Sequence, residues 1–501
     1  MSTIRRQSII SSIVIYTGFA VGLLNTYFFT KENLFTAEQY GLTTIFIAIA
    51  ALMMAFATLA MPSYIFKFFH YYNDHLPPRK NDMITWALLV GIIGFVLVII
   101  AGLVFKHLVI RKFSENSQQL VDYYYWIFPM GFGYTIYIIL EAYTWGLGKS
   151  VFTNFLREVQ WRLFTTFFIL LFMAGIIGSF DLFIKLFAFA YPGIAVILLA
   201  YLIFTKKIYF TFNISKVSRR FFKKILTLCI YFYSGTVIIT LSQVFDTIVI
   251  ASVLDDGVIK AGVFNLAFIL TSVIQAPQRG IISASVSHIS KGWKDKNMGL
   301  IQRIYQRSSI NQLVFAAGLF LLIWLNFTDA IITFKLKEVY LDGLYVFFFL
   351  GLTKVVDMGT GLNGQIISTS TYWRFELISG IILLAIMLPL TYIMAKRFDI
   401  IGPAIAGLIS ISIYNGIRIL FLWKKFKLFP FSLQSFYTLL LAAATFGICY
   451  FAFRDIHGLW GMIIRSIVFV AIYFSGAIYF KLSPDIQPVL QTIRKRLGLK
   501  K

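Results

Sequence analysis

Ionisable side chains inside long apolar segments are the residues of this sequence that could do chemistry. A charged group is costly inside a membrane unless it is paired or hydrated, so such residues commonly line the pathway of an ion, a proton or a polar substrate. Seven of them lie well inside the apolar segments: Glu141, Asp246, Arg279, Lys354, Asp357, Arg418 and Arg465. The sequence therefore predicts that charge within the bilayer carries the function.

Arg279 lies in the stretch SVIQAPQRGIISAS, two residues after Pro277. Proline and nearby glycine loosen a membrane helix, and polar groups are tolerated where such a helix meets a cavity. Arg279 is therefore a candidate for a cationic substrate-binding cavity. The alternatives are that its side chain extends to a membrane interface or that it pairs with Asp246.

Lys354 and Asp357 are three residues apart and so share one face of a helix. They either neutralise one another or form a pair whose ammonium is released to an anionic substrate in one state. Arg418 lies one turn after Asn415 and is followed by a basic exit from its segment. It either lines the cavity or extends towards the cytoplasmic interface.

Glu141 and Asp246 are the acidic candidates. A carboxyl group in the membrane could take up and release a coupling proton. The alternative for each is that it is the charge partner of a nearby arginine.

The sequence predicts no metal site and no cofactor. Cys229 and Cys449 lie in apolar runs, and neither has neighbours at metal-ligand spacing. They are interpreted as buried thiols without a disulfide. The five histidines are scattered, and the sequence has no Walker motif, so ATP hydrolysis by this chain is not expected.

Composition places the chain in a membrane. Its mean hydropathy is +0.80 and 13% of its 501 residues are charged, whereas a soluble domain carries roughly 25%. The formal net charge of +24 would favour nucleic-acid binding in a soluble protein. Here basic cytoplasmic loops facing anionic lipid headgroups explain it, so membrane lipids are expected as partners and nucleic acid is not.

Fourteen apolar runs are long enough to cross the ~30 Å hydrocarbon core, which predicts an all-α integral membrane protein. The predicted spans are 8–29, 41–66, 84–105, 121–143, 162–179, 183–204, 226–251, 261–285, 309–327, 343–362, 375–395, 400–422, 433–452 and 459–480. Of the 45 Lys and Arg residues, 29 fall in the termini and the loops after even-numbered spans, and 10 in the other loops. This asymmetry predicts that both termini are cytoplasmic.

The most basic loop follows the sixth span and divides the predicted helices. We expect an N-terminal lobe of six helices and a C-terminal lobe of six, followed by an extra helix pair. The predicted domains are 1–205, the basic linker 206–225, 226–424, and 425–501 with the pair and a basic tail. No loop exceeds about 20 residues, so the sequence leaves no room for a soluble catalytic domain and an enzyme is not expected.

Three motifs carry a resemblance to a known family. They are AEQYGLTTIF at the start of the second span, FDTIVIASVLDDGVIKAGVFNLAF at 245–268, and IIGPAIAGLISISIYNGIRILFLWKKFKL at 400–428. The chain resembles the polysaccharide-exporter branch of the MATE-like (multidrug/oligosaccharidyl-lipid/polysaccharide) flippase superfamily, which includes Wzx-type oligosaccharide flippases. It departs from the family pattern at Phe264, where Tyr is common. Its first span also lacks the basic residues expected of the lipid II flippase branch.

The resemblance implies a flippase of the bacterial inner membrane. Its substrate would be an oligosaccharide repeat unit on a polyprenyl diphosphate, used for O-antigen, capsule or exopolysaccharide synthesis. The flippase would move this substrate by alternating access. The resemblance also implies the polysaccharide polymerase machinery as a partner. Arg279, Lys354 and Arg418 would then bind the diphosphate in a cationic cavity, since an arginine fork holds phosphate oxygens in pairs.

Three other functions compete with this interpretation. A cation-coupled multidrug exporter of the same superfamily predicts an acidic or neutral cavity and typically twelve spans. A membrane-bound polymerase or glycosyltransferase would need a sizeable catalytic loop, and a channel would need a filter sequence. The sequence leaves the glycan, the coupling ion and the oligomeric state open.

Overall fold

The computed structural model describes residues 3–372 and 374–485, apart from the side chains of residues 3–9, 11, 12, 279, 283, 284 and 287. The regular elements in these ranges are helices, which confirms the all-α prediction. Within the same ranges, twelve helices are long and apolar enough to cross a membrane, and each overlaps a predicted span. The chain is therefore a multi-pass membrane protein. The fourth and fifth predicted spans have no counterpart among the twelve, so the number fourteen stays a prediction.

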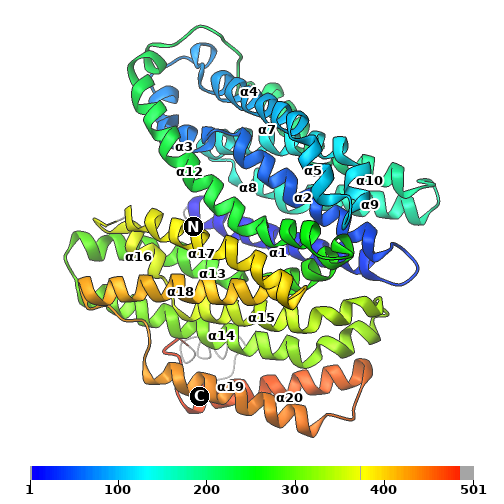
Figure 1. The fold of residues 1–501 in the computed structure, drawn as a ribbon. Coiled ribbons are helices and arrows are strands. Elements are labelled where there is room, and N and C mark those ends of the chain that lie inside the picture. The colour runs from blue at the N-terminus through cyan, green and yellow to red at the C-terminus, as the bar shows by residue number, and fades with distance from the viewer. Residues whose placement is uncertain (1–2, 373, 486–501) are drawn as a thin grey trace. The chain divides into compact units, whose positions relative to one another are not determined.

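The chain divides into two compact units, Met1–Gly262 and Val263–Lys501. The helices of the first unit, blue to green in Figure 1, are α1 (Thr3–Thr30), α2 (Ala37–Ala57), α3 (Met61–Asn73), α4 (Met83–Val104), α5 (Lys106–Phe113), α6 (Gln118–Asp122), α7 (Ile127–Gly146), α8 (Ser150–Phe155), α9 (Trp161–Met173), α10 (Phe180–Ala188), α11 (Ala190–Phe204) and α12 (Lys216–Val253). This division counts α12 with the first unit, whereas the predicted C-terminal lobe starts at residue 226. The predicted lobes, 1–205 and 226–424, describe which helices move together, and their boundaries stay a prediction.

The second helix shows how the local sequence positions a helix end and its contacts. The Thr36 hydroxyl accepts from the Gln39 backbone N–H, and the Gln39 side-chain oxygen accepts from the Thr36 backbone N–H, which satisfies two backbone donors at the start of α2. A side chain at Gly41 would overlap the carbonyl oxygen of Val258. The glycine of the sequence motif is therefore needed because two backbones approach closely here.

The structure displaces the predicted fifth span. Residues 150–173 form one continuous helix in which α8 and α9 are joined by the π-helical turn Leu156–Gln160. The prediction of 162–179 missed its first half because Arg157, Glu158 and Arg162 lower the hydropathy there. A π-helical turn widens the backbone locally and is frequent at functional sites.

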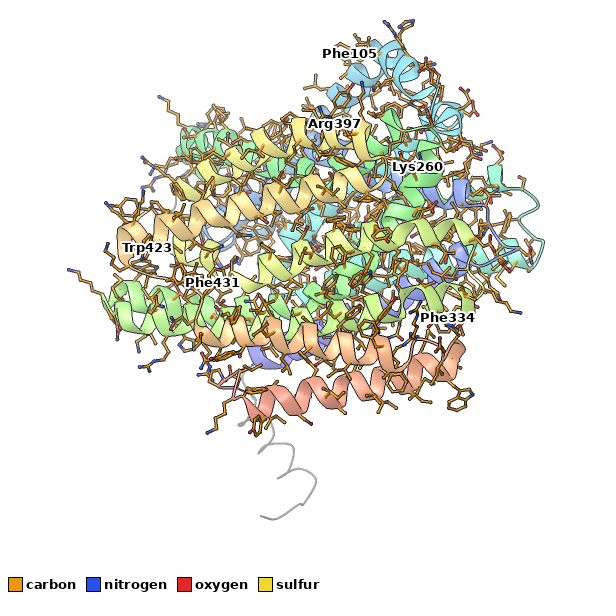
Figure 2. The ribbon with its side chains drawn as sticks, turned by 60° about the horizontal axis from the view of Figure 1, so that its bottom comes forward. Phe105, Lys260, Phe334, Arg397, Trp423 and Phe431 are labelled. Carbon is orange, nitrogen blue, oxygen red and sulfur yellow. The ribbon has the colours of Figure 1, made fainter. Side chains whose placement is uncertain are left out.

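The second unit begins within α13 (Gly257–Lys294) and continues with α14 (Met298–Thr333), α15 (Gly343–Gly359), α16 (Asn363–Thr369), α17 (Arg374–Phe398), α18 (Ile401–Phe426), α19 (Leu433–Ala452) and α20 (Gly458–Tyr479). Large side chains mark the helix ends: Figure 2 places Trp423 and Phe431 towards one end of these helices and Phe334 towards the other. All three are more than a third exposed, as expected for aromatic side chains near membrane interfaces.

The C-terminal helices α19 and α20 lie side by side (Figure 1), and polar contacts join α20 to α14. Arg465 forms a buried ion pair with Asp329, and the Tyr473 hydroxyl donates to the Val314 carbonyl at 2.8 Å. Beyond α20, Arg307 pairs with Asp485, and this hydrogen bond holds the pKa of Asp485 below its usual range. The predicted basic tail after Asp485 lies outside the described residues.

Candidate functional site

A chain of polar side chains crosses the second unit and contains two of the predicted site residues. The Asn415 amide donates to a carboxylate oxygen of Asp357 at 3.0 Å, and the Asn363 amide donates to Asn415 at 2.8 Å. Arg418 reaches the Asn363 oxygen at 3.5 Å and pairs with Glu376. Residues from α15, α16, α17 and α18 are thereby joined into one hydrogen-bonded network.

Arg418 is the anchor of this network. Its side chain is 7% exposed. Its Nε donates to the Ser379 hydroxyl at 3.2 Å, and its guanidinium lies 3.8 Å from the centre of the Tyr414 ring. An arginine held by a carboxylate, a hydroxyl and an aromatic face is fixed in orientation. Glu376, which the sequence analysis did not select, lies only two residues past Arg374 at the start of α17.

Lys354, unlike Arg418, is held by a neutral side chain. Its ammonium donates to the Gln275 amide oxygen at 2.8 Å and lies 6.0 Å from the Phe268 ring centre. Gln275 in turn donates to Gln278 at 2.8 Å. Lys354 and Asp357 share a helix face as predicted, but in the described part of the chain Lys354 forms no ion pair, with Asp357 or any other acid. The half-buried ammonium therefore has a neutral partner that an anion could replace.

The turn of α13 beside Lys354 contains the predicted cation Arg279. Gln275 and Gln278 precede it on the same helix, and Pro277 lies between them. The structure thus brings Lys354 to the helical segment of Arg279 through two glutamine side chains. The Arg279 side chain itself lies outside the described residues, so its predicted role stays a proposal.

A second cluster of charges lies within the first unit, around the π-helical turn. Arg157 contacts Glu141 at 3.1 Å and Glu158 at 3.6 Å, and Arg162 contacts Glu158 at 3.2 Å. Two cations and two acids therefore alternate in one row. Glu141 was predicted as a coupling or charge-pair residue and is one of the acids. The other three were missed because Arg157 and Glu158 precede the predicted fifth span and Arg162 is its first residue.

The first helix closes over this cluster. A Cβ at Gly22 would lie 3.1 Å from the Arg162 Nε, and one at Gly18 would overlap the Glu158 carbonyl. Asn25 of the same helix donates to the Arg162 carbonyl at 2.8 Å and accepts from Thr166 at 2.6 Å. Glycine, glycine and asparagine at positions 18, 22 and 25 are one turn apart. This spacing is the sequence signal that could have revealed a polar contact along α1.

Asp246, the remaining predicted acid, is half-buried on α12. Nothing in the described ranges could bind a metal through three or more His, Cys, Asp or Glu side chains. The two cysteines are buried and free. The candidate sites are therefore two charged networks, one in each unit.

Comparison with known proteins identifies the family. A family model described as "Polysaccharide biosynthesis protein" matches residues 4–291, which is more than half of the chain. The chain belongs to the polysaccharide biosynthesis protein family. No curated protein matches it by sequence.

Solved structures share the fold of this polysaccharide biosynthesis protein. A lipid II flippase MurJ in an inward closed conformation has a TM-score of 0.74 at 16% identity, with 94% of this chain and 99% of that chain covered. An inward-facing multidrug resistance MATE family transporter of the MOP superfamily has a TM-score of 0.64 at 14% identity, with 82% and 97% covered. At these identities the likeness shows the fold alone. The chain is therefore a polysaccharide biosynthesis protein whose fold is shared by these two structures.

Proposed function

We propose that this protein flips polyprenyl-diphosphate-linked oligosaccharide repeat units across the bacterial inner membrane for surface polysaccharide synthesis. The observation that carries the proposal is the Lys354 ammonium, which is half-buried in the membrane region and held by the neutral Gln275 oxygen at 2.8 Å. A diphosphate can take the place of an amide oxygen without breaking an ion pair. The cation then gains a charged partner in a medium where charge interactions are strong.

The other predicted residues take distinct parts in this mechanism. Arg279 lies on the helical segment beside Lys354 and would supply the fork that holds further phosphate oxygens. Arg418 is already bound to Glu376. It would therefore act indirectly, by holding in place the hydrogen-bonded side chains of Asn363, Asn415 and Asp357, the last of which is on the same helix as Lys354. Direct binding of the diphosphate by Arg418 would require the Glu376 pair to open.

The transport cycle would be alternating access, with the predicted lobes 1–205 and 226–424 rocking about the cationic cavity and both termini in the cytoplasm. Glu141 and Asp246 stay candidates for coupling to a proton gradient. Glu141 contacts Arg157 at 3.1 Å, and protonation of the carboxyl group would release that arginine. The contact between Glu141 and Arg157 of the π-helical turn would then be formed when the carboxyl group is ionised and broken when it is protonated.

Lys354→Ala tests the proposal in a strain that lacks the wild-type chain. Loss of the charge-assisted contact should reduce surface polysaccharide about tenfold or more, with lipid-linked repeat units accumulating on the cytoplasmic side. Lys354→Arg should retain part of the activity because it keeps the charge. Membrane levels of each variant are measured by immunoblotting.

Lys396→Ala is the matched control, because Lys396 is exposed near the end of α17 and lies 4.8 Å from the Tyr392 ring centre. It removes the same charge from the same unit outside the polar network. Full polysaccharide synthesis in Lys354→Ala, at a normal protein level, would contradict the proposal. Unchanged polysaccharide after deletion of the whole chain, with efflux of cationic dyes by the wild type, would favour the multidrug exporter.

A further inference from the structure

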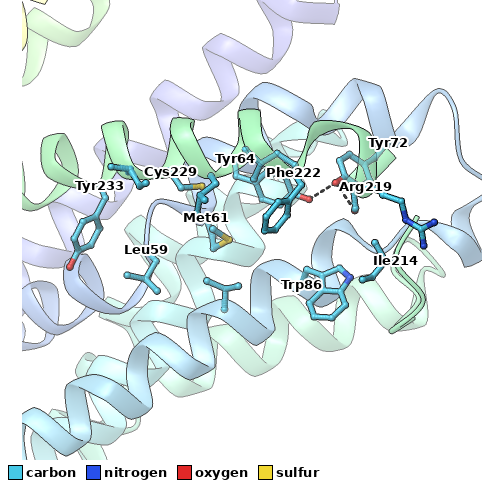
Figure 3. A pocket seen from close by; sticks show the side chains of 15 residues that line it. Leu59, Met61, Tyr64, Tyr72, Trp86, Ile214, Arg219, Phe222, Cys229 and Tyr233 are labelled. Carbon is cyan, nitrogen blue, oxygen red and sulfur yellow. Dashed lines mark hydrogen bonds between the residues drawn. The ribbon is translucent and has the colours of Figure 1, made fainter. Parts of the chain in front are cut away.

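A large apolar pocket opens in the first unit, away from the charged cluster. It has a volume of roughly 700 Å³ and lies between α3, α4 and the first half of α12 (Figure 3). Phe222, Leu226 and Ile230 of α12 contribute its rim and are each more than half exposed. The opposite wall includes Met61 and Val90.

The pocket is elongated along α12. Arg219 and Tyr233 line its two ends (Figure 3), and the fourteen helical steps from one residue to the other span about 21 Å. One leaflet of the hydrocarbon core is about 15 Å thick. The pocket is therefore long enough for one acyl chain of a membrane lipid.

One end of the pocket is cationic. Arg219 lines it directly, and α12 begins with the basic sequence KVSRRFFKK. Arg219 is exposed, and it forms no ion pair with another described residue. Figure 3 places Ile214 and Trp86 near this same end.

A buried donor lies at this end without a partner. The Trp86 Nε1 is buried and has no hydrogen-bond partner in the described structure. Hydroxyls elsewhere on the pocket wall are already hydrogen-bonded: Tyr64 donates to Tyr72 at 2.9 Å, and Ser218 donates to Asp82 at 2.7 Å. The Trp86 side chain lines this end of the pocket, and a small shift of the indole would turn its unsatisfied N–H towards an acceptor such as a lipid ester oxygen.

We propose that this pocket binds an anionic phospholipid of the membrane. One acyl chain lies along Phe222, Leu226 and Ile230, and the phosphate lies at Arg219. The glycerol ester region then lies near the Trp86 indole. Basic pockets between membrane helices are a common means of holding anionic headgroups.

The headgroup must supply the selectivity. An acyl chain leaves a hydrocarbon environment when it enters the pocket, so its transfer gains little from the hydrophobic effect. Every phospholipid has a phosphate that can contact Arg219, but only an anionic headgroup also has a net negative charge, which strengthens its attraction to this guanidinium. We therefore expect anionic lipids to bind more tightly than zwitterionic lipids with identical chains.

Quenching of tryptophan fluorescence by brominated acyl chains tests the proposal on the full chain. The protein is reconstituted in phosphatidylcholine vesicles and titrated with phosphatidylglycerol that carries brominated chains. We expect a saturable quenching component that Trp86→Phe removes. Arg219→Ala should shift its midpoint about fivefold to higher lipid fraction, and Arg219→Lys should restore most of the affinity.

Arg220→Ala is the matched control, because Arg220 is the next residue on α12, is exposed and does not line the pocket. It removes the same charge from the same helix end. Equal shifts in Arg219→Ala and Arg220→Ala would show only general surface attraction and overturn the proposal. Equal quenching by brominated phosphatidylcholine, or an unchanged saturable component in Trp86→Phe, would overturn it as well.

Discussion

Lys354 and Arg418 are intramembrane cations of the same unit, and their partners decide what each can do. Arg418 is bound to the Glu376 carboxylate and is almost fully buried, whereas Lys354 is bound to the Gln275 amide and is half-buried. Replacing a carboxylate partner leaves an uncompensated charge, but replacing an amide does not. Sequence reasoning placed both cations in one cavity, and the neighbouring side chains separate their roles.

Arg418→Ala is expected to destabilise the protein by about 2–3 kcal/mol, because Glu376 loses its partner and Ser379 and Asn363 lose a donor. The effect stays below that of a fully buried pair since the Glu376 side chain is 38% exposed. Thermal unfolding in detergent, followed by intrinsic fluorescence, measures it. The double variant Arg418→Met with Glu376→Gln should recover part of the loss, and an unchanged melting temperature in Arg418→Ala would refute this account.

Glycines at helix contacts determine how closely the elements approach. In the motif IIGPAIAG, a Cβ at Gly402 would overlap the carbonyl oxygen of Met394, so α17 and α18 meet through their backbones. Gly407, five residues later, has no neighbouring atom within 4 Å of such a Cβ. The motif therefore contains one glycine that the packing requires and one that it does not, and the letters alone do not distinguish them.

Gly402→Ala should destabilise the protein by about 1–3 kcal/mol, since the added methyl group forces α18 away from α17. Gly407→Ala is the matched control and should be neutral or slightly stabilising, because alanine favours the helix. Thermal unfolding of the two purified variants compares them directly. Equal destabilisation by both substitutions would mean that the close approach at Met394 does not limit the packing.

The number of membrane crossings is a property of the whole molecule, and two helices decide it. Among the described residues, twelve helices are long and apolar enough to cross a membrane. The helix α7 and the continuous helix 150–173 occupy the positions of the predicted fourth and fifth spans but are not among the twelve. Their charges are paired within the unit, since Glu141 contacts Arg157 and Glu158 contacts Arg162. Paired charges cost less to bury in a membrane, which favours crossing by both helices.

Lys149→Cys locates the turn between these two helices. In a background with Cys229→Ser and Cys449→Ser, we expect an impermeant maleimide on intact spheroplasts to leave Lys149→Cys unlabelled. His107→Cys, after the third predicted span, is the control and should react from the outside. Both positions are exposed in the structure, so accessibility reports the side of the membrane. Equal labelling of both variants from outside would place both ends of α7 on one side.

The sequence by itself determined the class of molecule. Charge is sparse, apolar runs recur at membrane-spanning length, and Lys and Arg alternate between loops, because the bilayer imposes these patterns on any chain that crosses it. The motifs at 245–268 and 400–428 further indicated the family to which the matched model assigns the chain. These signals depend only on local composition and spacing, so they can be read without coordinates.

The tertiary structure alone decided which charges are paired. Arg157, Glu158 and Arg162 look unsuited to a membrane helix until Glu141, from a different helix, is found beside them. Lys354 was expected to interact with Asp357 on its own helix, yet its ammonium contacts Gln275, which is 79 residues away. The energy of a buried charge depends on partners distant in sequence, and folding determines which partners those are.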